Sequence, residues 1–193
     1  MNVIECHFQS DGTTCAGTLM LPDGSTTPPV IVMAHGFANI RTASLPAFAE
    51  RFVDAGYAAF LFDYRTFGDS QGEPRQYVHP QRQLADWDAA IEYVRTRPEI
   101  DPERLVLWGT SFSGGHVLHL AARHGELAAV ISQVPHLSGP ATVAKVPPLT
   151  LVKSTLAGLL DAAASLLNRT FYSPVVGQPG ELAALTADNA SEA

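Results

Sequence analysis

Hydrophobic and polar residues alternate at the start of the chain, and short continuous apolar runs replace this pattern further on. Residues 3–9 and 15–21 alternate with period two, and the turn signal Ser10-Asp11-Gly12 lies between them. Such alternation indicates strands with one buried face, and a two-residue Asp-Gly loop favours a hairpin. The beginning of the chain therefore predicts an antiparallel β-hairpin.

The register of this hairpin decides how its two cysteines relate to each other. It pairs Phe8 with Cys15 and Cys6 with Gly17. The cysteines then lie on one face but diagonally, about 7–8 Å apart. That separation is long for a disulfide, so we expect two free thiols that pack against the sheet.

After a polar connector at residues 25–29, apolar runs alternate with helical patterns. Short apolar runs between turn signals are typical of strands that are buried on both faces of a parallel sheet. The expected strands are residues 30–34, 58–62, 105–108 and 127–131, and the expected helices are residues 45–55, 81–96 and 112–124. This order predicts an α/β sheet with right-handed crossovers.

The rhythm stops after Val134. Residues 135–148 are typical of a loop, and residues 150–170 of one amphipathic helix or a pair of helices. A Pro/Gly-rich stretch and a tail of small residues follow, and no further strand is expected. We therefore divide the chain into a core at residues 1–135 and a second segment at residues 136–193.

Composition and charge narrow the function classes. The 193 residues are 46% hydrophobic and carry a formal net charge of −7, which fits a globular fold. No lysine and arginine cluster could neutralise a phosphate backbone, so nucleic-acid binding is excluded. Without a secretory signal or an apolar run that could span a bilayer, we expect a cytoplasmic protein with no membrane partner. Histidines and carboxylates show no ligand spacing, so neither a metal nor a cofactor is expected.

The sharpest chemical signal is the segment Gly109-Thr110-Ser111-Phe112-Ser113, which joins an apolar strand to a helix. Small residues two before and two after a serine allow the sharp turn called a nucleophile elbow, and Gly109 is one of them. The turn lifts the hydroxyl of Ser111 above the sheet edge and aims helix amides at the reacting centre. Ser113 replaces the usual glycine but is small enough. Ser111 is the candidate nucleophile, and an ordinary Gly/Ser turn is the alternative.

A second motif, His35-Gly36-Phe37, follows a predicted strand. In this architecture its loop lies beside the elbow, so the backbone amides of Phe37 and Phe112 are candidate donors for an oxyanion hole. Gly36 allows the backbone to turn inward. We expect His35 to hold the loop through a side-chain hydrogen bond rather than to react.

The third motif is Asp63-Tyr64-Arg65-Thr66-Phe67-Gly68-Asp69-Ser70, where we expect Asp63 and Arg65 to hold a loop by hydrogen bonds and ion pairing. Together the three motifs resemble the α/β-hydrolase superfamily, in particular its serine-aminopeptidase-like, dienelactone-hydrolase-like and Xaa-Pro-dipeptidyl-peptidase-like branches. The likeness covers about residues 3–135. It implies a mostly parallel sheet with an N-terminal antiparallel hairpin, and a cap or lid that starts at residues 150–170. It also implies a serine hydrolase of ester, thioester or amide bonds that acts on a small acyl substrate.

The same resemblance exposes a gap, because the family's triad runs Ser, then Asp or Glu, then His along the chain. The last histidine is His136, just past the sixth strand, whereas the family's base follows the eighth; substrate contact or a plain loop position suits it better. Three histidines of the helix after the elbow are expected on its surface or in packing: His116, His119 and His124. Of the carboxylates, Asp161 lies in the expected cap and Glu181 and Asp188 in the tail, with no strand expected before them.

The resemblance thus implies a member that is truncated at its C-terminus, without the last two strands, the closing helix, the acid and the base. We expect impaired activity, marginal stability, and an unpaired edge at the sixth strand that favours self-association. The alternative function is a non-catalytic remnant or interaction module that pairs through this edge. A dehalogenase or epoxide hydrolase is disfavoured, because those relatives place aspartate where this chain has Ser111.

Overall fold

The computed structural model describes residues 1–24, 27–167 and 169–186. The chain forms two compact units, Met1–Leu137 and Ser138–Ala193, and each is described by itself. The boundary that we expected, after residue 135, lies two residues before the observed one. Part of the connector expected at residues 25–29, and Asp188 of the tail, lie outside the described residues.

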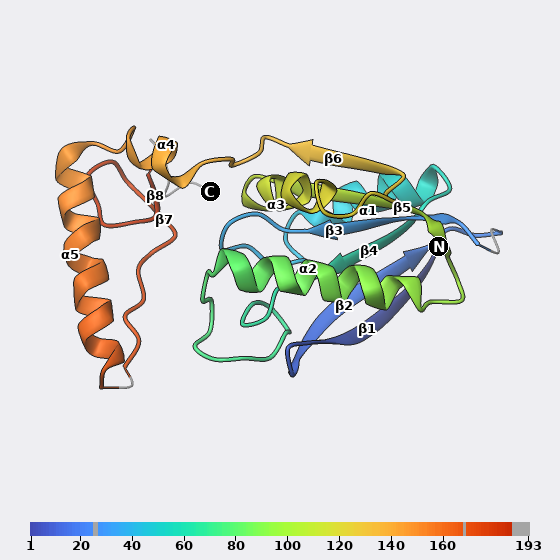
Figure 1. Cartoon of the computed structure of the whole chain (residues 1–193), viewed down its shortest axis with the longest axis horizontal. Helices are drawn as coiled ribbons and strands as arrows, with labels where there is room; N and C mark the ends of the chain where they lie inside the picture. The colour runs from blue at the N-terminus through green and yellow to red at the C-terminus, as the bar shows by residue number, and fades with distance from the viewer. Residues whose placement is uncertain (25–26, 168, 187–193) are drawn as a thin grey trace. The chain divides into compact units, whose positions relative to one another are not determined.

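The first unit is built on one sheet of six strands in the order β1-β2-β4-β3-β5-β6 (Figure 1). Its strands are β1 (Asn2–Ser10), β2 (Thr13–Leu21), β3 (Pro29–Ala34), β4 (Ala58–Phe62), β5 (Asp101–Thr110) and β6 (Ala129–Gln133). The pairs β1/β2 and β2/β4 are antiparallel, and the others are parallel. The expectation of a mostly parallel sheet with an N-terminal antiparallel hairpin is confirmed.

The hairpin has the predicted register, with Phe8 opposite Cys15 and Cys6 opposite Gly17. Both cysteines are buried and free. Burial removes water from the thiol and raises the pKa of Cys15 to about 12. Its thiol therefore stays protonated and packs in the core, as the sequence predicted.

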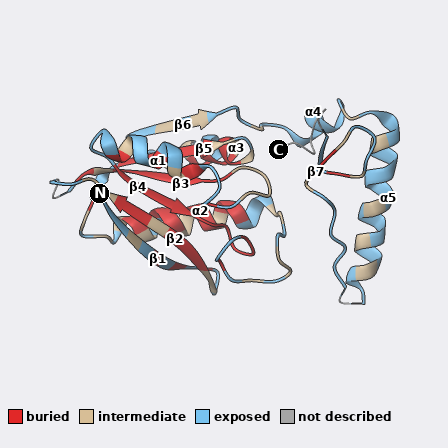
Figure 2. Ribbon diagram, turned by 180° about the vertical axis from the view of Figure 1, so that it is seen from behind, coloured by how far each residue is buried: buried red, intermediate tan, exposed pale blue. Residues whose placement is uncertain are grey.

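Three helices cover the two faces of the sheet: α1 (Leu45–Asp54), α2 (Pro80–Arg95) and α3 (Phe112–Ala121). Strand β3 shows the division, because Val30 and Val32 pack with α2 and α3 while Ile31 and Met33 pack with α1. Figure 2 shows buried residues concentrated in the strands and in the inner sides of these helices. On α2 the predicted apolar face is buried: Leu84, Trp87, Ala90, Ile91 and Val94.

Strand β6 differs from the expected residues 127–131 and runs two residues further along the chain. Its pairing with β5 starts at Ala129 opposite Val106, and Leu127 packs against the core before the strand begins. The strand continues to Gln133 because the Gln133 carbonyl accepts a hydrogen bond of 2.9 Å from the amide of Ser111. Among the described residues β6 pairs with β5 alone, so it forms an edge of the sheet.

The second unit contains helices α4 (Gly139–Val143) and α5 (Pro148–Ser165) and two short parallel strands, β7 (Val176–Gly177) and β8 (Leu185–Thr186). These strands correct the expectation that none follows Val134. Their apolar pairs are too short to stand out as a pattern, and they form a sheet of their own.

Helix α5 also differs from the expected residues 150–170, since it starts and ends earlier. None of its described residues is buried (Figure 2), and Leu156 and Leu159 are 56% and 63% exposed. No helix in the described part of the chain combines the length and the apolar character that a membrane crossing requires. A cytoplasmic location stays a prediction from the sequence.

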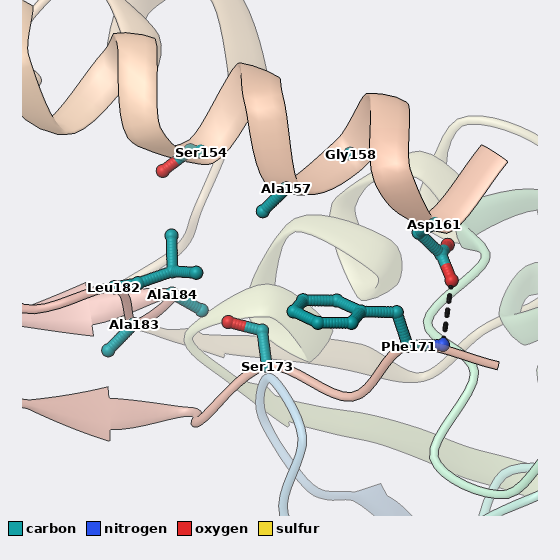
Figure 3. Close-up of a pocket in the computed structure, with 9 residues that line it drawn as sticks. All are labelled: Ser154, Ala157, Gly158, Asp161, Phe171, Ser173, Leu182, Ala183 and Ala184. Atoms are coloured by element: carbon teal, nitrogen blue, oxygen red, sulfur yellow. Dashed lines mark hydrogen bonds between the residues drawn. The ribbon is translucent and has the colours of Figure 1, made fainter. Parts of the chain in front are cut away.

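A pocket of about 240 Å³ lies within the second unit, between α5 and the segment that follows it (Figure 3). Small residues of α5, among them Ala157 and Gly158, line one wall. Asp161 at its end accepts a hydrogen bond of 3.0 Å from the amide of Phe171. This carboxylate therefore fixes the chain that returns along the helix.

Candidate active site

The residue between β5 and α3 is Ser111, and its backbone has φ 55° and ψ −114°. A positive φ is strained for a residue other than glycine, and such strain is typical of functional turns. Hydrogen bonds hold it from both sides. The Ser111 amide donates to Gln133, and the Ser111 carbonyl accepts from the amide of His136 at 2.8 Å. The Ser111 side chain is exposed at this sharp turn, as the elbow motif predicts.

Small residues around the turn are required by close backbone contacts. A Cβ at Gly109 would overlap the carbonyl oxygen of Ser113 and lie 3.0 Å from the amide nitrogen of Gly114. A Cβ at Gly115 would overlap the carbonyl oxygen of His136. The glycines therefore let the first turn of α3 lie against both β5 and the loop that follows β6.

Ser113 occupies the position where the strict motif has glycine. Its side chain is fully buried, and its hydroxyl accepts a hydrogen bond of 3.1 Å from the hydroxyl of Tyr64. The Tyr64 hydroxyl in turn accepts one of 2.9 Å from the indole nitrogen of Trp87. This chain of hydrogen bonds joins three elements behind the elbow. The sequence analysis did not predict these hydrogen bonds. The signal that could have indicated them is the serine at position 113, where the motif usually has glycine.

The His35-Gly36-Phe37 loop lies against the elbow. A Cβ built at Gly36 would lie 3.2 Å from the Cβ of Ser111 and 3.3 Å from the carbonyl oxygen of Thr110. The rings of Phe37 and Phe112 meet edge to face, with centroids 5.9 Å apart. Neither residue's amide donates to a backbone carbonyl within residues 1–24, 27–167 and 169–186. The loop is thus next to Ser111, and the role of the two amides stays a prediction.

His35 is fully buried beneath this loop. Its Nδ1 donates a hydrogen bond of 2.9 Å to the carbonyl of Gly36, and its Nε2 lies 3.8 Å from Asp63 Oδ1. Burial disfavours the charged imidazolium and lowers the pKa of His35. A neutral imidazole therefore holds the turn of the loop.

The loop after β4 is held by two buried ion pairs. Asp63 accepts hydrogen bonds from the backbone amide of Arg41 at 2.7 Å and from its guanidinium, and Arg65 binds Asp86 of α2 through Nε at 2.7 Å. A buried carboxylate needs such partners. The sequence suggested the role of Asp63 and Arg65 but not the partners Arg41 and Asp86, which come from distant segments.

Three histidines near the elbow each have a partner of their own. His116 is buried, and its Nδ1 donates a hydrogen bond of 2.7 Å to the carbonyl of Phe112. His124 follows the end of α3 and lies 2.9 Å from a carboxylate oxygen of Asp88. His136 is half-buried, and its ring centroid is 5.5 Å from that of Phe112. The bonds of His116 and His124 are thus made to groups other than the Ser111 hydroxyl.

The candidate acids also have local partners. Glu181 follows β7 and accepts a hydrogen bond of 2.8 Å from the amide of Gln178. Like Asp161, it lies in the second unit. Both carboxylates thus fix the local backbone of that unit.

The sequence is similar to one family model and to several known proteins. Residues 26–191 match the family model described as "Serine aminopeptidase, S33". The quorum-quenching protein AidA of Acinetobacter baumannii is 44% identical over 188 residues, which are 97% of this chain and 62% of that protein. The thiohydrolase aneE of Aspergillus aculeatus is 39% identical over 125 residues, covering 65% of this chain and 39% of that protein.

Solved structures have the same fold. The α/β-hydrolase GrgF from Penicillium sp. sh18 superimposes with a TM-score of 0.78 at 26% identity, covering 94% of this chain and 61% of that one. DcsB in complex with its substrate analogue gives a TM-score of 0.73 at 27% identity, covering 90% and 57%. The expected α/β-hydrolase fold is confirmed. The chain spans less than two thirds of the length of each of these relatives.

Proposed function

Because the chain belongs to the serine aminopeptidase S33 family, we propose that it is a serine hydrolase in which Ser111 is the nucleophile. The observation that supports this proposal most strongly is the strained, exposed serine between β5 and α3. A hydroxyl in that position can approach a carbonyl carbon without a rearrangement of the backbone. The strain is kept because hydrogen bonds to Gln133 and His136 fix the turn.

In the proposed reaction, Ser111 Oγ bonds to the carbonyl carbon of the substrate and gives up its proton to a base. Negative charge develops on the carbonyl oxygen of the resulting tetrahedral intermediate, and the amides of Phe37 and Phe112 donate hydrogen bonds to it. The N-terminus of α3 adds favourable potential at the same place. The bond from the carbonyl carbon to the leaving group then breaks, the alcohol or thiol departs with a proton, and an acyl-enzyme remains. Water subsequently hydrolyses the ester to Ser111 and regenerates the free hydroxyl.

A serine hydroxyl needs a general base at neutral pH. The hydrogen-bonding partners of His116 and His124 are the Phe112 carbonyl and the Asp88 carboxylate, not the Ser111 hydroxyl. We therefore propose that the 193-residue chain reacts slowly by itself. In serine hydrolases the loss of the triad histidine costs on the order of 10⁶ in kcat, and about 10³–10⁴ over water remains.

The substrate class proposed is a small acyl ester or thioester, with an amide as the harder alternative. The names of two relatives indicate acyl chemistry in those proteins: the thiohydrolase aneE and the polyketide transferase grgF of Penicillium sp.. Those names describe those proteins. For this chain the support is the shared fold and the family match over residues 26–191.

A second candidate function is self-association through β6. The strand has no charged residue and no proline, and Ile131 is 40% exposed. Such an edge invites pairing with another chain. Light scattering during size-exclusion chromatography tests this: a dimer that Ile131→Lys converts to a monomer supports edge pairing, and a stable monomer contradicts it.

The catalytic proposal is tested by chemical rescue with imidazole. We expect the chain to hydrolyse a p-nitrophenyl ester slowly, and we expect added imidazole, as an external base, to raise the rate of the chain more than that of Ser111→Ala. The variant corrects for direct hydrolysis by imidazole. Equal rates in the two proteins would contradict a nucleophilic role of Ser111. A fast reaction without imidazole would contradict the proposal that Ser111 has no general base in this chain.

A further inference from the structure

Three half-buried rings lie next to the elbow, and we name them the aromatic collar: Phe37, Phe112 and His136. The rings of Phe37 and Phe112 are almost perpendicular, at 86°. The rings of Phe112 and His136 are tilted by 46°, with their centroids 5.5 Å apart. Phe112 is therefore the central ring of the group.

Each ring is tied to the nucleophile by the backbone. Phe112 follows Ser111 directly, and the amide of His136 donates its hydrogen bond to the Ser111 carbonyl. Phe37 follows Gly36, whose backbone packs against the Cβ of Ser111. The rings are thus held in place by the same contacts that hold the elbow.

Because each of these three residues is only half-buried, part of its surface is exposed beside Ser111. Aromatic groups gain from edge-to-face and offset contacts beyond the burial of their area. The central ring is also supported from behind, because the His116 ring lies 4.9 Å from it. A ligand that approaches Ser111 therefore meets preorganised aromatic surface rather than flexible side chains.

We propose that the aromatic collar binds a flat aromatic or conjugated group of the acyl substrate, next to the bond that is cleaved, and that His136 is a specificity-determining residue. This inference rests on the proposed function, because it assumes that Ser111 is the reacting group. His136 contributes its ring from the loop after β6, and its hydrogen bond to the elbow uses only its backbone. Its side chain can therefore be exchanged without removing that bond.

Two sulfonyl fluorides that differ in one ring provide the test. Phenylmethylsulfonyl fluoride carries a benzyl group and methanesulfonyl fluoride a methyl group. In both reactions a bond forms between Ser111 Oγ and sulfur, the S–F bond breaks, and the hydroxyl proton passes to solvent. Intact-mass spectrometry of the full chain gives both rates, each corrected for the probe's hydrolysis in buffer.

We expect the chain to favour the benzyl probe, and His136→Ala to lower this preference about two- to tenfold. His136→Phe should restore it, since it returns a ring to the same place. A variant that merely disturbs the elbow slows both probes together and leaves their ratio unchanged. Equal corrected rates of the two probes at Ser111, or a ratio unaffected by His136→Ala, would contradict the proposed role of the aromatic collar. Neither result would contradict the proposed role of Ser111. If neither probe modifies Ser111, the proposed function is wrong, and the proposed role of the aromatic collar is wrong as well.

Discussion

The hydroxyl of Tyr64 donates a hydrogen bond of 3.1 Å to the hydroxyl of Ser113, directly behind the candidate nucleophile. Both side chains are almost completely buried, at 1% and 0% exposure of the residue. The Tyr64 hydroxyl also accepts from Trp87 of α2. Burial raises the pKa of Tyr64, so the phenol stays neutral and keeps its proton to donate. The first turn of α3 is thereby connected to α2 and to the loop after β4.

Replacing the phenol should be costly. Tyr64→Phe leaves the indole N–H of Trp87 buried without an acceptor, and we expect a loss of about 1–3 kcal/mol in the free energy of unfolding. Urea denaturation measures this. Tyr57→Phe, on an exposed tyrosine, is the matched control and should change stability by less than about 0.5 kcal/mol. Equal effects of the two substitutions would show that the buried hydrogen bonds contribute nothing.

The close approach at Gly109 predicts a second effect. Gly109→Ala places a methyl group against the backbone of Ser113 and Gly114, and we expect a destabilisation of about 1–3 kcal/mol or more. Gly125→Ala, where an added Cβ meets nothing within 4 Å, is the control. Thermal unfolding of both variants checks the prediction. A Gly109→Ala protein as stable as the control would mean that the elbow is not packed as described.

The backbone strain at Ser111 predicts that a substitution which relieves it increases stability but removes the reactive hydroxyl. Glycine adopts a positive φ without penalty, so Ser111→Gly should raise the free energy of unfolding by about 1 kcal/mol while it removes the hydroxyl. Ser111→Ala removes the hydroxyl but keeps the strain. Chemical denaturation should therefore rank the glycine variant above the alanine variant. The reverse order would argue against a strained turn.

His116 makes stability depend on pH. Its burial lowers its pKa below the unfolded value near 6.5, so the unfolded chain binds the proton more readily. Stability is then complete above about pH 6.5 and falls as pH drops below it, by at most about 1.4 kcal/mol per pH unit for this group. Unfolding free energies measured at about pH 7.5 and about pH 5.5 should differ less in His116→Gln than in the parent. His7→Gln, on an exposed histidine, should behave like the parent.

The sequence predicted the parts of the fold that depend on local pattern. The hairpin register follows from one Asp-Gly turn, and the buried face of α2 follows from helical spacing. The start of β6 was wrong by two residues, because its pairing depends on contacts with β5 and the elbow rather than on its own apolar residues. Strands β7 and β8 were missed because two-residue strands leave no periodic signal.

In the candidate site, too, local sequence patterns could be predicted and long-range contacts could not. The sharp turn at Ser111 could be predicted because a strained turn restricts which residues can occupy it. The partners Arg41, Tyr64 and Trp87 were missed, since long-range hydrogen bonds have no signature in a single sequence. The ring contact between His136 and Phe112 was missed for the same reason.

The most direct test of the central claim is to identify the residue that an organofluorophosphonate modifies. The chain is incubated with excess reagent, digested and analysed by tandem mass spectrometry, with Ser111→Ala treated in parallel. We expect one slowly formed adduct on Ser111 and none in the variant. An adduct on another residue that persists in Ser111→Ala, or no adduct at all after prolonged incubation, would contradict the assignment of Ser111 as the nucleophile.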